Sequence, residues 1–218
     1  MKSILIIGIG KFGHHLCENF CRMKNEVMIV DCQEEAIEDL LPMVTSAKVG
    51  DCTNVEVLKT LGIDNFDLCF VCIGTNFQSS LEITSQVKEL GGKMVISKAD
   101  RDIHAKFLLR NGADEVIYPS RDVAERIAVR YSENHIYDYI ELDDEISIYE
   151  ISPLESWIGK SIREVDCRAR YQVNIIGVRR NGRMKMISMA DYIFKKEEHL
   201  LVIGQDKDVK KLLRRLRD

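Results

Sequence analysis

The chain has 218 residues, of which 45% are hydrophobic and 30% charged, and its formal net charge is −4 at pH 7. This composition is typical of a globular protein with one large domain or two modest ones, and the negative charge gives no indication of a nucleic-acid partner. No apolar run approaches the roughly 20 residues of a membrane-spanning helix. Seven cysteines without a spaced framework favour a reducing cytoplasm.

Six short apolar runs in the N-terminal part of the chain predict β-strands. Each run is too short for a helix, is rich in Val and Ile, and is bounded by turn residues. The runs are continuous rather than alternating, which is typical of strands whose two faces are both covered by helices. They are Ser3–Ile7, Glu26–Val30, Ser46–Val49, Leu68–Ile73, Lys93–Ser97 and Glu115–Tyr118.

Helical patterns lie between these runs and complete a series of β/α units. The clearest pattern places Phe12, Leu16, Phe20 and Met23 on one helix face. Six such units in this order predict an α/β fold with a Rossmann-like, doubly wound parallel sheet. We expect this nucleotide-binding domain to span residues 1–119.

The pattern of predicted strands and helices changes in the remaining residues. After a helical stretch over 120–134, the acidic segment Glu141–Glu145 is interpreted as a domain boundary. We therefore predict a crossover helix and linker over 120–140 and a small α+β domain over 141–218. The elements expected there are a strand at Ile146–Ile151, a short helix at Gly159–Val165, a strand at Val173–Arg180 turning at Asn181-Gly182, a strand at His199–Gly204, and a helix capped by Asp206 with Val209, Leu212, Leu213 and Leu216 on one face.

A glycine-rich turn directly follows the first predicted strand and opens a helix. The sequence Gly8-Ile9-Gly10-Lys11-Phe12-Gly13 has the spacing of a dinucleotide-binding fingerprint, and Asp31 ends the second strand 18 positions after Gly13. The first glycine permits the tight turn, the second lets phosphates approach the backbone, and the third lets the helix pack on the strand. The helix N-terminus then attracts phosphate. Asp31 can accept hydrogen bonds from both ribose hydroxyls and repels a 2′-phosphate, which disfavours NADP.

Polar residues also follow the ends of the neighbouring predicted strands, at the sheet edge where ligands of open α/β folds bind. Asp51 and Thr53 are candidates for contact with adenine or its ribose, and Thr75 and Asn76 for the phosphate side. Lys98, at the end of the fifth strand, is a candidate phosphate-facing cation. The full set of predicted nucleotide-binding residues is Gly8, Gly10, Lys11, Phe12, Gly13, Asp31, Cys32, Asp51, Cys52, Thr53, Gly74, Thr75, Asn76 and Lys98.

The sequence offers no obvious catalytic group and no metal site. His104 lies in a helical pattern and is interpreted as a surface histidine, and no histidine is paired by sequence with a carboxylate and a substrate-binding arginine. The P-loop motif of ATP hydrolysis is absent. Cys69 and Cys72 have CxxC spacing, but on a strand they face opposite ways and cannot chelate one metal. We predict binding without chemistry, with an NAD-dependent oxidoreductase as the alternative.

Taken together, these motifs resemble the regulator-of-potassium-conductance (RCK) family, and within it the KtrA/TrkA-type cytosolic subunits of bacterial potassium transporters. The resemblance covers both predicted domains in order. It is carried by the residues quoted above and by Phe77-Gln78, Ser97-Lys98-Ala99, Asn111-Gly112-Ala113-Asp114, Tyr118-Pro119, Gly159-Lys160-Ser161-Ile162 and Leu201-Val202-Ile203-Gly204.

This resemblance implies a non-enzymatic gating subunit. In the family, ATP and ADP, or NADH and NAD, compete for the N-terminal cleft and bias an oligomeric ring between conducting and resting shapes. A crossover helix, here about residues 120–133, joins two subunits into a dimer. Dimers assemble into a ring, commonly octameric, docked on a KtrB- or TrkH-like membrane subunit that translocates potassium. The chain is therefore expected in the cytoplasm, held at the inner face of the membrane by its partner.

The sequence departs from the family pattern at two positions. Lys11 replaces an arginine that commonly contacts the terminal phosphate, and Lys keeps the charge but loses the bidentate fork. Ser120 stands where the KtrA branch has a glutamate linked to divalent-cation activation, so we predict no metal there. Some members bind cyclic di-AMP at the C-terminal domain, but no specific match for its contacts is found. An RCK-type regulator of another cation channel or antiporter is a further alternative.

Overall fold

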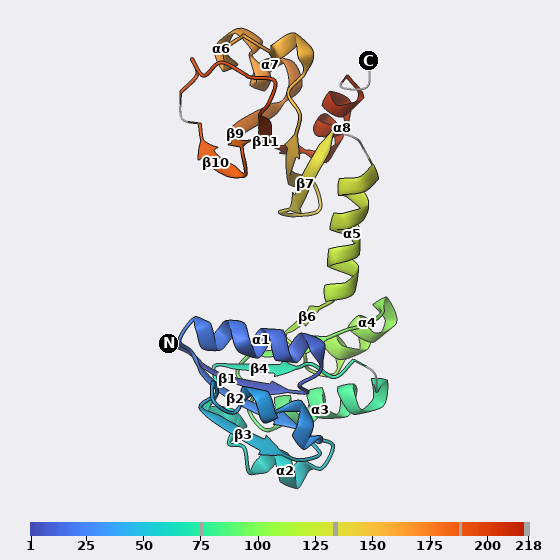
Figure 1. The fold of residues 1–218 in the computed structure, drawn as a ribbon. Helices are drawn as coiled ribbons and strands as arrows, with labels where there is room; N and C mark the ends of the chain where they lie inside the picture. The colour runs from blue at the N-terminus through green and yellow to red at the C-terminus, as the bar shows by residue number, and fades with distance from the viewer. Residues whose placement is uncertain (75, 133–134, 188, 216–218) are drawn as a thin grey trace. The chain divides into compact units, whose positions relative to one another are not determined.

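The computed structural model describes residues 1–74, 76–132, 135–187 and 189–215 (Figure 1). The chain divides into two compact units, Met1–Arg121 and Asp122–Asp218. Each unit has its own sheet and its own buried core. Across the described residues, no helix combines the length and the apolar character that crossing a membrane requires.

The first unit contains a six-stranded parallel sheet with the order β3-β2-β1-β4-β5-β6. This is the predicted doubly wound arrangement, and the strand order reverses between β1 and β4. Two strands end earlier than predicted, at Val71 and Ile117, because the residues that follow leave the ladder to form loops at the sheet edge. The strands are β1 (Ser3–Ile7), β2 (Glu26–Asp31), β3 (Ser46–Val49), β4 (Leu68–Val71), β5 (Val95–Lys98) and β6 (Glu115–Ile117).

Alternate residues of the central strand β1 belong to two separate cores. Ile4 and Ile6 pack on the face covered by α1, whereas Leu5 and Ile7 pack on the face covered by α2 and α3 (Figure 1). Because both faces are buried, a continuous apolar run was the correct signal for this strand. The helical elements are α1 (Lys11–Arg22), η1 (Glu34–Ala36), η2 (Glu38–Leu40), α2 (Val55–Lys59), η3 (Ile63–Asn65), α3 (Phe77–Glu89) and α4 (Asp102–Arg110).

One prediction about side chains in this unit is confirmed, and another is wrong. Cys69 and Cys72 lie in the two different cores, on opposite faces of the sheet, so the prediction that they cannot share a metal is confirmed. Met23 was expected on the buried face of the first helix but is 70% exposed. The reason is that α1 ends at Arg22, and Met23 is its C-cap, where the backbone leaves the helical path.

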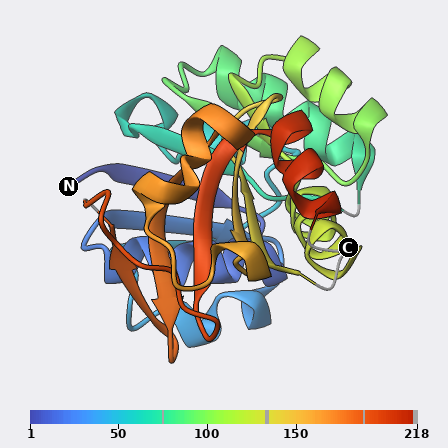
Figure 2. The ribbon, with the colours of Figure 1, turned by 90° about the horizontal axis from the view of Figure 1, so that it is seen from above.

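The second unit contains a five-stranded antiparallel sheet with the order β10-β9-β11-β8-β7. Helix α8 packs against β11, and Figure 2 shows it in red beside the strands. The largest fully buried side chains of the core are Trp157, Tyr149 and Phe194. The elements are α5 (Pro119–Ser132), which begins in the first unit, β7 (Ile136–Glu141), β8 (Ile146–Ile151), η4 (Glu155–Trp157), α6 (Ile162–Val165), α7 (Cys167–Tyr171), β9 (Val173–Arg180), β10 (Arg183–Met186), β11 (His199–Gln205) and α8 (Asp206–Arg214).

The acidic segment Glu141–Glu145 comprises the last residue of β7 and the hairpin turn that follows it, and it is not a domain boundary. It joins β7 to β8, which pair antiparallel in the same sheet. The carboxylate of Asp143 accepts the backbone N–H groups of Glu145 and Ile146, at 2.8 and 2.7 Å. The acidic residues therefore satisfy backbone donors in a tight turn, and the interpretation of this segment as a boundary is wrong.

The N-cap of the terminal helix lies one residue earlier than predicted. Gln205 is the N-cap, and Asp206 is the first helical residue, whose carboxylate accepts a hydrogen bond from the Tyr149 hydroxyl at 3.1 Å. Asp206 was therefore wrongly assigned as the cap. The predicted apolar face is present at Val209, Leu212 and Leu213, and Leu216 lies outside the described residues.

An ion pair between Arg126 of α5 and Asp138 of β7 gives the second unit a pH-dependent stability. The guanidinium donates to Asp138 at 2.7 to 3.0 Å, and this hydrogen bonding lowers the pKa of Asp138. A lowered pKa in the folded state means stabilisation that is present above the ordinary aspartate value of about 3.9 and lost as the pH falls through the folded pKa. Because Arg126 is half exposed, the pair contributes less than about 1 kcal/mol.

We expect Asp138→Asn to lower the free energy of unfolding by about 0.5 to 1 kcal/mol at pH 7. The difference from wild type should shrink to zero in acid, below the folded pKa of Asp138, because the wild-type carboxyl is then also neutral. Urea unfolding at a series of pH values measures this. A difference that stays constant into acid would contradict the assignment.

Candidate functional site

A pocket of about 730 Å³ opens at the carboxyl ends of strands β1 to β5 in the first unit. Its volume lies within the range of small-molecule and cofactor sites. It is also placed where a doubly wound sheet binds ligands, beside the reversal between β1 and β4. The lining residues are Ile7, Gly8, Gly10, Lys11, Phe12, Val30, Asp31, Cys32, Gln33, Gly50, Asp51, Cys52, Thr53, Cys72, Ile73, Gly74, Asn76, Ser79, Ile83, Lys98, Pro119 and Ser120.

Most of the predicted nucleotide-binding residues line this one pocket. Gly13 does not, since it packs behind the loop against Gly8, and Thr75 lies outside the described residues. Sequence reasoning missed several lining residues, among them Gln33 and Ile73. Their only signal was their place next to a predicted strand end. The residues brought together as predicted are Gly8, Gly10, Lys11, Phe12, Asp31, Cys32, Asp51, Cys52, Thr53, Gly74, Asn76 and Lys98.

The three glycines of the turn lie in three different structural environments. Gly8 has a φ of +91°, and a Cβ there would lie 2.9 Å from Ile73 Cγ1. A Cβ on Gly13 would lie 2.2 Å from the carbonyl oxygen of Gly8, so only glycine lets α1 pack this closely on the end of β1. A Cβ on Gly10 would meet nothing within 4 Å. The second glycine therefore faces open pocket space, which leaves its backbone accessible to a ligand.

The N-terminus of α1 faces the pocket, and its first turn is not capped by the side chain of an N-cap residue. Gly10 is the N-cap and has no side chain to accept the N–H groups of this turn, which begins with Lys11 and Phe12. These N–H groups carry the positive end of the helix dipole. Lys11 adds a positive side chain to the pocket lining. The arrangement can hold an anion such as a phosphate.

Asp31 fastens the end of β2 to the glycine turn. One carboxylate oxygen accepts the backbone N–H of Ile9 at 2.6 Å, and the other accepts the N–H of Gln33 at 3.0 Å. Each carboxylate oxygen has a second lone pair. Asp31 can therefore hold the turn in place and still accept hydrogen bonds from ligand hydroxyls in the pocket.

Two further polar residues of the pocket are already engaged in local turns. Asp51 accepts both the backbone N–H and the hydroxyl of Thr53, at 2.9 and 2.8 Å, and these hydrogen bonds lower the pKa of Asp51. Asn76 is the N-cap of α3 and accepts the N–H of Ser79 at 3.1 Å. Both residues thus shape the rim of the pocket. A binding role for their remaining polar atoms stays a prediction.

Lys98 is held beside Gly74 by an acidic neighbour. Its Nζ lies 2.7 Å from Asp100 Oδ1. A Cβ on Gly74 would lie 2.2 Å from Asp100 Oδ2 and 2.5 Å from Lys98 Nζ, so the glycine makes room for the ion pair. The predicted phosphate-facing cation is therefore paired with a carboxylate that sequence reasoning did not anticipate. The carboxylate also orients the ammonium group at the pocket wall.

The environment of the pocket favours the neutral form of its thiols. Burial raises the pKa of the Cys52 thiol to about 12, and it also raises the pKa of Cys72 to about 12. The pKa of Cys32 is raised by burial and by the neighbouring Asp31 carboxylate. All three are therefore neutral thiols at physiological pH. The pocket offers these residues as packing surface rather than as reactive groups.

His104 is a core residue, and its interpretation as a surface histidine is wrong. It is only 1% exposed, packs its ring 4.9 Å from the ring of Phe77, and shares a hydrogen bond of 3.2 Å with the Ser80 hydroxyl. Burial lowers its pKa. Helix α4 packs against α3 with His104 on its buried face, and the polar character of histidine concealed this packing.

Comparison with known proteins agrees with this geometry. Residues 4–119 match the TrkA-N domain model and residues 146–217 match the TrkA-C domain model. The chain belongs to the family of TrkA-N and TrkA-C domain proteins. It is 35% identical to the Ktr system potassium uptake protein C of Bacillus subtilis (strain 168), over 99% of this chain and 97% of the relative.

Solved structures share the fold of this chain. A crystal structure of the GsuK RCK domain aligns with a TM-score of 0.68 at 18% identity, covering 100% of this chain and 48% of that one. The GsuK channel bound to NAD aligns with a TM-score of 0.66 at 19% identity, covering 99% of this chain and 38% of that one. The chain thus spans less than half the length of these structures. The resemblance to RCK proteins is confirmed at the level of fold, and the resemblance to KtrA/TrkA-type proteins at the level of family.

The glycine turn gives a matched pair of substitutions. Gly13→Ala should destabilise the protein by about 1 to 3 kcal/mol, because its methyl group would overlap the Gly8 carbonyl oxygen. Gly10→Ala should change stability by less than about 1 kcal/mol, yet weaken nucleotide binding, because its methyl group would enter the pocket. Urea unfolding and ATP titration separate the two effects. The account of the turn is wrong if Gly10→Ala binds ATP as tightly as wild type.

Proposed function

We propose that this chain is a non-enzymatic, nucleotide-sensing regulatory subunit of a bacterial potassium uptake system. The relatives that match nearly its whole length are named as Ktr system potassium uptake proteins, including one of Bacillus subtilis at 35% identity. The observation that carries the nucleotide-sensing part is the pocket. It combines the uncapped N-terminus of α1, the open backbone at Gly10 and the carboxylate of Asp31.

The chemistry of the pocket favours an adenine nucleotide without a 2′-phosphate. The phosphates would lie against the first turn of α1 with Lys11, and the ribose hydroxyls against Asp31. ATP, ADP, NAD and NADH all carry these groups, and the GsuK channel of the same fold has been solved with NAD. A 2′-phosphate would meet the Asp31 carboxylate and be repelled. Lys11 as a point charge discriminates less sharply between terminal phosphates than an arginine fork would.

Regulation would follow from a difference in affinity. A nucleotide shifts a conformational equilibrium only as far as it binds one conformation more tightly than the other. The groups able to respond are the strand-end loops around the pocket, because Asp51, Asn76 and Asp100 hold local contacts that a ligand can compete with. ATP and ADP, or NADH and NAD, would thus bias the oligomer toward different shapes.

Self-association of the chain is supported by α5. Its apolar residues Val123, Ile127 and Tyr131 are all more than half exposed and recur every four residues, so they form a stripe along one side of the helix. We place α5 in a crossover segment between a domain over 1–119 and a C-terminal domain that includes β7. Dimers formed through this segment would assemble into an octameric ring. The ring would dock on a KtrB- or TrkH-like membrane subunit at the cytoplasmic face of the membrane.

The decisive contact to test is the one between Asp31 and the ribose. A hydrogen bond to a charged group is worth about 1.5 to 3 kcal/mol, or roughly 10- to 100-fold in affinity. We therefore expect wild type to prefer ATP over 2′-deoxy-ATP by at least about tenfold. Asp31→Asn should bind ATP more weakly and lose most of this preference. Calorimetric titration of ATP and of 2′-deoxy-ATP into wild type and into Asp31→Asn measures how much of this preference depends on the Asp31 carboxylate.

Asp39→Asn is the matched control, because this aspartate lies outside the pocket lining and should leave the preference unchanged. An equal preference in wild type and Asp31→Asn would remove Asp31 from the site. Potassium uptake by the membrane subunit, measured with each protein and with ATP or ADP, then tests regulation. Oxidation of NADH by the purified protein would instead support the oxidoreductase alternative.

A further inference from the structure

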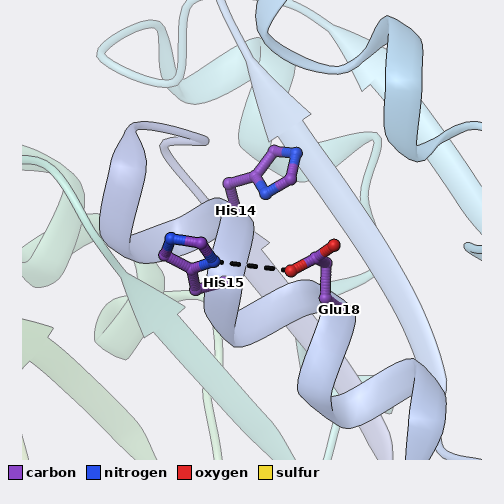
Figure 3. A group of neighbouring side chains, drawn as sticks. All are labelled: His14, His15 and Glu18. Atoms are coloured by element: carbon purple, nitrogen blue, oxygen red, sulfur yellow. Dashed lines mark hydrogen bonds and ion pairs between the residues drawn. The ribbon is translucent and has the colours of Figure 1, made fainter.

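Three side chains outside the nucleotide pocket gather on the surface of α1. They are His14, His15 and Glu18, and one ligand atom from each lies within 4.8 Å of the others (Figure 3). His15 Nδ1 is already 3.4 Å from Glu18 Oε2. The nucleotide-binding proposal gives none of the three a role.

The spacing on the helix explains the gathering. Glu18 follows His14 by four positions and His15 by three, and these are the two separations that bring side chains together on a helix surface. Glu18 therefore lies beside both imidazoles (Figure 3). The rings of His14 and His15 are nearly perpendicular, with centroids 5.9 Å apart, so their nitrogens can approach a common point without stacking.

A fourth residue, distant in sequence, sets the chemical state of His14. Asp39 of η2 lies with its Oδ2 2.7 Å from His14 Nε2. The carboxylate can only accept, so Nε2 carries a proton, and in the neutral imidazole the lone pair is then on Nδ1. A carboxylate that receives the outer N–H of an imidazole is the usual support of a metal-binding histidine.

We propose that His14, His15 and Glu18 form a binding site for a divalent transition metal of the zinc class, with Asp39 as the carboxylate that orients His14. Two imidazoles and one carboxylate suit zinc and its neighbours in the first transition row, whereas magnesium and calcium prefer all-oxygen ligands. Three protein ligands leave a fourth tetrahedral position for water, and His15 and Glu18 are accessible to it from solvent.

A metal at this site would connect α1 to η2. His14 is the residue directly after Gly13, so the site begins where the glycine turn ends. The metal would fix the imidazole of His14 and, through it, the contact with Asp39. It would thereby stabilise the folded first unit by mass action, with a free energy that rises with the logarithm of the free metal concentration once this exceeds the dissociation constant.

Cobalt(II) titration of the full-length, untagged protein tests this proposal, because tetrahedral cobalt absorbs visible light and reports its ligands. We expect one cobalt ion per chain, displaced by zinc, with the visible bands of nitrogen and oxygen ligation. His15→Gln and Glu18→Gln should abolish this binding. Asp39→Ala should weaken it by about 10- to 100-fold, as is typical when the carboxylate behind a metal-bound histidine is removed.

His135→Gln is the matched control, since it removes a histidine from the other unit and should leave cobalt binding intact. The substituted ligands are surface residues, and thermal unfolding without metal verifies that each variant is folded. Three results would overturn the proposal: wild type that binds no cobalt, unchanged binding by Glu18→Gln, or an intense near-ultraviolet thiolate-to-cobalt band. The last would assign the metal to cysteines.

Discussion

The close approach of Gly13 to the carbonyl oxygen of Gly8 determines where the first helix stands. Because a Cβ at Gly13 would lie only 2.2 Å from that oxygen, α1 can pack directly on the end of β1 only with glycine there. This contact brings the helix N-terminus to the edge of the sheet. Asp31 then holds the intervening turn through the N–H of Ile9. The position of the α1 N-terminus, the open backbone of Gly10 and the pocket itself all follow from this geometry.

Sequence patterns were most informative where one physical requirement dominates. The central strand could be predicted because burial on both faces demands a continuous apolar run. The hairpin at Asn181-Gly182 could be predicted because a two-residue turn between right-twisted strands needs positive φ at both positions, and these residues have φ of 49° and 74°. The pocket residues were found by the rule that ligands bind at the carboxyl edge of such a sheet.

Prediction was wrong where a residue type serves two purposes. The acidic residues of Glu141–Glu145 suggested a solvated linker, but Asp143 uses its carboxylate to close a turn inside a sheet. His104 was taken for a surface residue, although a neutral imidazole can be buried when a hydroxyl such as that of Ser80 satisfies it. Lys98 was expected to face phosphate and does line the pocket, but its ion pair with Asp100, only two residues away, was not anticipated.

The central claim is that the free N–H groups at the start of α1 receive the phosphates of an adenine nucleotide. Hydrogen–deuterium exchange over the segment Gly8–His14, with and without saturating ATP, tests it most directly. Within this segment the amides of Gly8, Ile9 and His14 donate to Val30, Asp31 and Gly10. The amides of Lys11, Phe12 and Gly13, in the first turn of α1, have no acceptor within the helix and should exchange rapidly in the free protein. The account predicts that ATP slows their exchange. Bound ATP that protects another part of the chain and leaves this segment unchanged would contradict it.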